Sequence, residues 1–127
     1  MKKVERAYDA FRRGDLEAFV ALHHPDCEVM PMQAQVEGEL YRGHDGVRAF
    51  WEHLRSVFED WRPVAEEIRD HGELIIVRIR VTGRAGQSGV MFDETMWQAL
   101  RVRDGLVWWW GNYRTEVEAL EVIGLRE

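Results

Sequence analysis

The residues with the greatest capacity for acid–base chemistry in this sequence are a histidine, an asparagine and an aspartate. His23 is a candidate proton carrier, because imidazole titrates near neutrality; alternatively it ends a helix and hydrogen-bonds a backbone carbonyl. Asn112 could donate its amide N–H to a ligand carbonyl or oxyanion, or it could satisfy the end of a strand. Asp93 shares its strand parity with Thr95 and Trp97. It could therefore act as a base at a pocket mouth, or be a solvated carboxylate beside a glycine-rich loop.

The other chemistry-bearing residues form no recognisable motif. The histidines fall on different predicted elements, without HExxH or Cys/His ligand spacing: His23, His24, His44, His53 and His71. Cys27 is the single cysteine, which excludes an internal disulfide and a cysteine-rich zinc site. Residues 83–89 lack the GxxxxGK[ST] arrangement, and Ser88 has no His and Asp at a triad-like spacing. We therefore predict no metal site and no cofactor, and nothing supports nucleophilic catalysis.

Length and composition restrict the class of protein. The 127 residues suffice for one domain, residues 1–127, with 46% hydrophobic and 31% charged residues, as in soluble globular proteins. A formal net charge of -6 with scattered basic residues argues against nucleic acid as a partner. No apolar run approaches the roughly 18 residues of a membrane span, and no signal-peptide core follows Met1. We expect no membrane partner and a cytoplasmic location.

Helical patterns dominate the first half of the chain. Apolar residues at helical spacing predict a helix from Val4 to Phe11, stopped by Gly14, and a second from Leu16 to Leu22, capped by Asp15. A short strand from Cys27 to Met32 and a loop from Gly38 to Asp45 follow. The strongest helix carries its apolar stripe from Val47 to Phe58 and ends before Pro63.

Strand patterns dominate the second half. The predicted strands are 64–69 at an edge, 74–82, 90–103 and 106–114, with a hairpin loop at 83–89 and a two-residue turn at Asp104–Gly105. Thr115 and Glu118 fit the capping box of a short last helix, stopped at Gly124–Leu125. Helices followed by antiparallel strands indicate an α+β fold with helices on one face of a curved sheet.

Three consecutive tryptophans follow the Asp104–Gly105 turn. In a strand, Trp108 and Trp110 face one side of the sheet and Trp109 the other. Extending the two-residue turn predicts that Ala99 pairs with Trp110 and Trp97 with Asn112. Both faces of this hairpin are mostly apolar. We therefore expect helices to cover one face and a second copy of the chain to cover the other, with Met96, Leu100, Trp109 and Tyr113 needing that cover.

The order of four segments resembles the nuclear transport factor 2-like superfamily, especially its SnoaL-like (polyketide-cyclase-like) and ketosteroid-isomerase-like members. The segments are AFRRGDLEAFVALHHPD, YRGHDGVRAFW, RVRDGLVWWWGNYR and EALEVIGL. The resemblance implies a curved, mixed or antiparallel sheet wrapped around N-terminal helices to form a cone-shaped pocket. It also implies homodimers that form through the outer sheet face. Around the pocket it places His23 and Asn112 as catalytic candidates, and as ligand-binding candidates Trp51, Trp97, Trp110, Val29 and Val77.

The best-known catalytic residues of these relatives have no counterpart here. The steroid-isomerase tyrosine, base and hydrogen-bonding aspartate correspond to Ala7, Pro31 and Trp97. The epoxide-hydrolase Asp-Arg-Asp set corresponds to Val81, Ile79 and Asn112, and the late aspartate of polyketide cyclases falls near Asn112 without a carboxylate. These chemistries are therefore not expected.

Three functions remain open. The chain could be a metal-free isomerase, cyclase, hydratase or dehydratase that acts on a small, largely apolar molecule, with His23 as proton carrier and Asn112 as polariser. It could instead be a non-catalytic ligand binder or dimeric accessory domain, which the missing carboxylates favour. A protein-interaction adaptor would have its tryptophan pocket filled. We favour the ligand pocket and leave enzyme status open.

Overall fold

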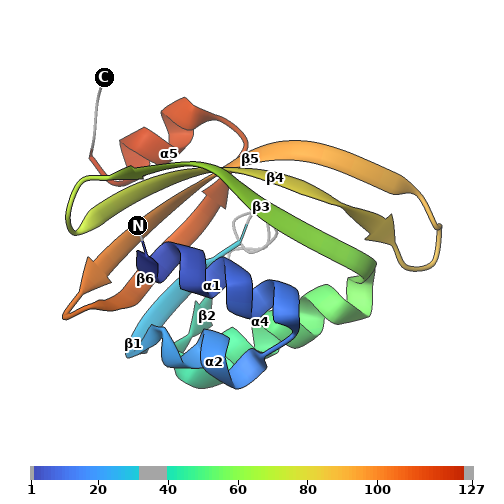
Figure 1. Cartoon of the computed structure of the whole chain (residues 1–127), viewed down its shortest axis with the longest axis horizontal. Coiled ribbons are helices and arrows are strands. Elements are labelled where there is room, and N and C mark those ends of the chain that lie inside the picture. Colours follow the sequence, from blue (N-terminus) through green and yellow to red (C-terminus); the bar gives the residue numbers. More distant parts are fainter. Residues whose placement is uncertain (1, 32–39, 125–127) are drawn as a thin grey trace.

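The computed structural model describes residues 2–31 and 40–124, which form a curved sheet with helices on both sides (Figure 1). Met32, Gly38 and Leu125, which the sequence analysis used as element boundaries, lie outside these residues. The elements are α1 (Lys2–Arg13), α2 (Leu16–Ala21), β1 (His23–Met30), β2 (Tyr41–Arg42), α4 (Gly43–Val57), β3 (Phe58–Asp70), β4 (Leu74–Ala85), β5 (Met91–Arg103), β6 (Leu106–Tyr113) and α5 (Glu116–Val122). This arrangement confirms the predicted α+β class.

The six strands form one mixed sheet in the order β2-β1-β6-β5-β4-β3. Strands β1 and β6 are parallel, and the other neighbours are antiparallel. Helices α1, α2 and α4 lie on the inner side of the curved sheet, whereas α5 lies on its outer side (Figure 1). The predicted sheet around N-terminal helices is therefore present, and the long strands β3, β4 and β5 form most of its curvature.

The predicted N-terminal helix and its stop are both present. In α1, Val4 and Tyr8 are buried on the face predicted from their spacing. Gly14 has a φ of 72°, which a glycine adopts without steric cost, so the chain turns after the helix. The Oδ1 of Asp15 accepts a hydrogen bond from the Ala18 N–H at 3.1 Å and caps α2.

Strand β3 begins earlier than predicted. Helix α4 ends at Val57, and Phe58 opens a strand of 13 residues that contains Pro63. Proline lacks a backbone donor, but β3 is an edge strand and tolerates it on the unpaired side. Strand β4 also runs past the predicted boundary, to Ala85. Its Ile75, Val77, Ile79 and Val81 are buried on the inner face, as their alternation predicts.

The predicted register of the last hairpin is wrong by one residue. The turn at Asp104–Gly105 is present, with φ of 53° and 76° as a type I′ turn requires. Val102 pairs with Val107 but Arg101 pairs with Trp109, so Trp108 is the extra residue of a β-bulge. Beyond the bulge Leu100 pairs with Trp110, Gln98 with Asn112 and Trp97 with Tyr113.

The bulge decides which side chains face the pocket side. Trp110 and Asn112 share the inner face with Leu100 and Gln98, and they lie on the side covered by α1 and α4. Trp97, Ala99, Trp109 and Tyr113 share the outer face. Trp97 was predicted to face inward, and this placement corrects that prediction.

Helix α5 covers the outer apolar face of the hairpin. Ala119, Leu120 and Ile123 pack with Ile76, Ala99 and Tyr113, and Trp97 and Trp109 border this cluster. The Oγ1 of Thr115 accepts the Glu118 N–H at 3.2 Å and begins the helix, as the predicted capping box requires. The cover that the sequence analysis assigned to a second copy is thus supplied by the chain itself, and Leu100 and Met96 belong to the inner core. The homodimer stays a prediction.

Candidate functional site

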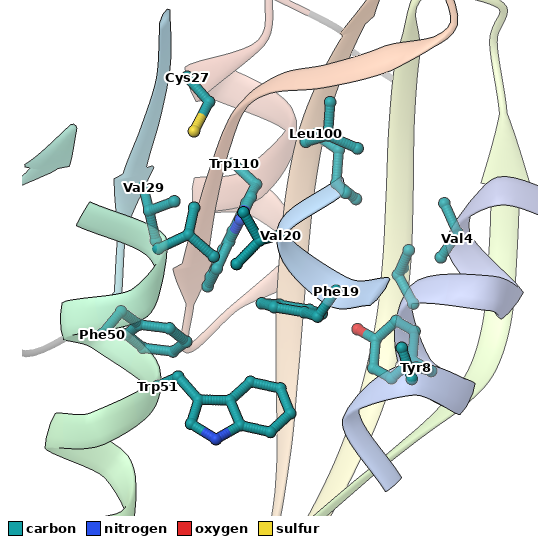
Figure 2. Packing of buried hydrophobic residues seen from close by; sticks show 14 of the residues in the cluster. Val4, Tyr8, Phe19, Val20, Cys27, Val29, Phe50, Trp51, Leu100 and Trp110 are labelled. Carbon is teal, nitrogen blue, oxygen red and sulfur yellow. The ribbon is translucent and has the colours of Figure 1, made fainter. Parts of the chain in front are cut away.

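A small chamber lies between the inner helices and the sheet. Its volume is about 70 Å³, and its walls include Tyr8, His23, Gln98, Trp110 and Asn112. A cavity of roughly 150 Å³ is needed to accept a benzene ring, so this inner chamber can hold a functional group but not the body of an aromatic ligand. Figure 2 shows the Tyr8 hydroxyl and the Trp110 indole directed into the space between helices and sheet. Buried aromatic and aliphatic side chains pack around this chamber.

His23 is held by both ring nitrogens. Trp110 donates its indole N–H to the Nε2 atom of His23 at 3.0 Å, so Nε2 is an acceptor and the ring proton lies on Nδ1. The Nδ1–H donates to the Phe19 carbonyl at 2.9 Å. The side chain is 3% exposed, and this burial lowers the His23 pKa to about 4. The ring is therefore neutral at pH 7 with no vacant position for a proton.

This geometry matches the alternative considered for His23, a ring bonded to a backbone carbonyl of the preceding helix, although His23 itself opens β1 just after α2 ends. The ring joins α2, through the Phe19 carbonyl, to β6, through Trp110. It lines the inner chamber, but its hydrogen-bonding capacity is used within the protein. A structural role thus replaces the predicted role as proton carrier.

A row of three polar side chains crosses the chamber wall from α1 to β6. The Tyr8 hydroxyl donates to Gln98 Oε1 at 2.9 Å, and Gln98 Nε2 donates to Asn112 Oδ1 at 3.1 Å. Burial raises the pKa of Tyr8, so its hydroxyl is neutral at physiological pH. Tyr8 keeps oxygen lone pairs, and the Gln98 amide has a second N–H. This row, which we call the polar row, can accept a hydrogen bond from a ligand and donate one to it.

Sequence reasoning found Asn112 but missed Tyr8 and Gln98. Tyr8 was assigned to the apolar stripe of the first helix, where its ring does pack in the core. Gln98 shares the strand parity of Leu100, which was predicted to face outward because the bulge at Trp108 was not foreseen. The available signal was a lone amide among apolar residues on one face of a half-buried strand, which usually has a buried partner.

A second, larger space adjoins the inner chamber. This mouth chamber has a volume of about 380 Å³ and shares Phe50, Leu54, Trp61 and Asn112 with the inner one. Its further walls are Pro31, His53, Phe58, Phe92, Glu94 and Met96. A volume above roughly 300 Å³ is typical of small-molecule sites. The body of a ligand therefore fits here, with Asn112 within reach of both chambers.

Two predicted ligand-binding valines and one tryptophan belong to the packed core. Val29 and Val77 are 0% exposed in the main cluster. Trp51 packs against Phe11 and Phe19, with ring centroids 4.8 Å and 5.4 Å apart. It borders a lateral groove on the side of α1 and α4, and the walls of the two chambers do not include it among the described residues.

Trp97 and Asp93 lie on the outer face of the sheet. The Arg69 guanidinium stacks over Trp97 at 5.4 Å from the ring centroid. Asp93 accepts two hydrogen bonds from Arg80, one of them at 2.8 Å, and this guanidinium lowers the Asp93 pKa. Both were predicted near the pocket because they share one strand parity, which the predicted register placed on the inner face. The observed register, shifted by one residue, places that parity on the outer face. Trp110, by contrast, is on the predicted wall.

Of the two chambers, only the mouth chamber has a carboxylate among its described walls. Of the described residues that line the inner chamber, none is an Asp, Glu, Lys or Arg. The mouth chamber has Glu94 and His53 in its described walls. In the parts of the chain that the structure describes, no three His, Cys, Asp or Glu side chains gather as a metal ion would require, and no helix is long and apolar enough to cross a bilayer.

Comparison with known families agrees with this architecture. The family model of the SnoaL-like domain matches residues 4–110, most of the chain. The chain belongs to the SnoaL-like family. The resemblance inferred from the four sequence segments is thereby confirmed.

Solved structures place this SnoaL-like domain among proteins of the same fold. An NTF2-like protein of unknown function from Burkholderia pseudomallei K96243 is 25% identical, with a TM-score of 0.81 over 97% of this chain and 95% of that one. IdmH from Streptomyces antibioticus, described as a candidate polyketide cyclase, is 25% identical, with a TM-score of 0.75 over 98% and 97% of the two chains. TerC, co-crystallised with polyporic acid, is 21% identical, with a TM-score of 0.79 over 97% and 96%. No functionally curated protein matches the sequence.

Proposed function

We propose that this SnoaL-like domain binds a small, largely apolar molecule that carries one neutral hydroxyl or carbonyl group. The observation that carries the proposal is the polar row of Tyr8, Gln98 and Asn112, which forms the polar part of an otherwise aromatic and aliphatic chamber. The ligand body would lie in the mouth chamber, and its polar group would reach the polar row past Phe50 and Leu54. The absence of charge from the described inner walls favours a neutral group.

Relatives of this fold give the proposal a precedent. TerC has been co-crystallised with polyporic acid, and IdmH is described as a candidate polyketide cyclase. An unsubstituted hydrocarbon would leave the polar row without a ligand partner, whereas a hydroxyl could donate to the Tyr8 oxygen or accept from the Gln98 amide. We therefore expect selection for the polar group as well as for apolar area.

The test compares 2-naphthol with naphthalene, which lacks the hydroxyl. We expect wild-type protein to bind 2-naphthol about five- to tenfold more tightly, the effect of roughly 1 kcal/mol for a neutral hydrogen bond. Gln98→Leu should remove most of that difference, and Gln87→Leu, a matched change in the exposed turn after β4, should retain it. Equal affinities of the two ligands for wild-type protein would contradict the proposal.

Acid–base catalysis at the mouth is the second candidate function. His23 has no vacant ring position and Tyr8 is neutral, so a proton-transfer step would use His53 or Glu94, which line the mouth chamber. Once a substrate is found, His53→Gln and Glu94→Gln should each lower kcat, while His71→Gln, on an exposed turn, should not. Full activity of both variants would contradict a catalytic role for His53 and Glu94 and leave ligand binding as the proposed function.

A further inference from the structure

Two side chains border three cavities of this domain. Leu54 and Trp61 line the inner chamber, the mouth chamber and the lateral groove of about 430 Å³ between α1, α4 and β3. Among the described walls, they are the residues common to all three. Leu54 is buried, with 7% of its surface exposed, and belongs to the main core, whereas Trp61 is only partly buried. Trp61 is therefore the partition that can change without opening the core.

The absence of a side chain at Gly83 makes room for the Phe92 ring, which in turn contacts Trp61. Trp61 on β3, Gly83 on β4 and Phe92 on β5 are paired across the strands. A Cβ atom at Gly83 would overlap the Asp60 backbone oxygen and lie 2.8 Å from the Phe92 ring, so only glycine permits both close approaches. The Trp61 centroid is 5.7 Å from that of Phe92 and 4.7 Å from that of Phe58.

Trp61 is held differently from the other tryptophan of the pocket wall. Trp110 is fixed by the hydrogen bond from its indole N–H to His23. Trp61 is positioned by ring contacts with Phe58 and Phe92, both of them partly buried. It also lies on an edge strand, which has a neighbour on one side only. Replacement of its ring therefore disturbs fewer fixed contacts than replacement of Trp110.

We propose that Trp61 sets the upper size limit of the ligand. This inference rests on the proposed function. With Trp61 in place, the ligand body is confined to the mouth chamber of about 380 Å³, near the lower end of small-molecule sites. That space suits a one- or two-ring arene alcohol or ketone. Removal of the indole joins the mouth chamber to the lateral groove and admits a neutral ligand of four fused rings in the same orientation.

The experiment measures the affinities of 2-naphthol, with two rings, and 1-hydroxypyrene, with four. Trp61→Ala should raise the affinity for 1-hydroxypyrene relative to that for 2-naphthol about tenfold or more, which corresponds to 1.4 kcal/mol. Trp61→Phe should give an intermediate ratio and serves as the milder variant if the alanine protein is poorly folded. The matched control is Trp108→Ala, because Trp108, like Trp61, is a partly buried tryptophan on a strand, but it lies under Arg103 and lines a different groove.

Each outcome is decisive. An unchanged ratio of the two affinities in folded Trp61→Ala and Trp61→Phe would overturn the size limit while the proposed function stood. Loss of both ligands from a folded Trp61→Ala protein would show that the indole is required for either ligand to bind and does not limit ligand size, and would also overturn the proposal. Failure of wild-type protein to bind 2-naphthol would refute the proposed function itself.

Discussion

Acidification should destabilise this protein through a single buried imidazole. The pKa of His23 is lowered from 6.5 to about 4 in the folded chain, chiefly because burial penalises the charged ring. Between those two values the unfolded chain binds a proton that the folded chain excludes, so stability rises with pH. This stability is fully present above pH 6.5 and is lost as the pH falls toward 4.

The magnitude follows from the size of the pKa change. Each pH unit between 6.5 and 4 costs about 1.4 kcal/mol, so the whole interval removes about 3 kcal/mol of unfolding free energy. A domain of this kind has about 5–15 kcal/mol in total. The cost arises because burial penalises the charged ring and because a protonated Nε2 could no longer accept the Trp110 N–H.

The assay is urea unfolding at about pH 7 and about pH 4.5 for wild type, His23→Gln and His71→Gln. Glutamine retains one donor and one acceptor but does not titrate. The free energy of unfolding should therefore fall less between about pH 7 and about pH 4.5 in His23→Gln than in wild type, by about 2 kcal/mol. His71 is exposed, and its variant should behave like wild type. Identical pH dependence in wild type and His23→Gln, or an NMR titration of His23 with a pKa between about 6 and 7, would refute this account.

Three further predictions concern groups outside the polar row. Cys27 is fully buried, and burial raises the pKa of its thiol to about 11. A thiol reagent at neutral pH should therefore react slowly with the native protein and rapidly with the protein unfolded in guanidinium chloride. Fast reaction with the native protein would contradict the buried placement of Cys27. Leu120→Ala should cost about 2–5 kcal/mol in urea unfolding, because Leu120 anchors α5 on the outer face; a cost below about 1 kcal/mol would mean that α5 is not an essential cover. Asp93→Asn should leave both the urea midpoint and the 2-naphthol affinity nearly unchanged, since the pair with Arg80 is exposed and screened by solvent; a tenfold loss of affinity would return Asp93 to the pocket.

Local patterns predicted the elements well, because each left a signal in its own residues. The stripe of α1, the Gly14 stop, the Asp15 cap and the Asp104–Gly105 turn are all present. Periodicity reports which residues of a helix or strand share a face, and in these elements that face was buried. The start of β3 at Phe58 was missed because its apolar and charged residues also fit the end of a helix.

The site depended on one non-local detail that no local pattern carried. Because of the bulge at Trp108, the face of β5 that lies beside Trp110 and Asn112 is the opposite of the predicted one. Trp97 and Asp93 therefore lie on the outer face, and Gln98 lies on the inner face. A register follows from two whole strands and their packing, and one inserted residue is enough to change it. His23 was correctly predicted to line the pocket. It cannot carry a proton because its Nε2 accepts the indole N–H of Trp110, which lies 87 positions away in the sequence.

Side-chain NMR of the protein during titration with 2-naphthol tests the central claim most directly. The account predicts saturable shifts of the Gln98 and Asn112 side-chain amides and of the Trp61 and Trp110 indole N–H signals, with one common affinity. The Trp97 and Trp109 signals, on the outer face beneath α5, should stay in place. Shifts confined to the outer-face tryptophans, with Gln98 and Asn112 unmoved, would contradict it.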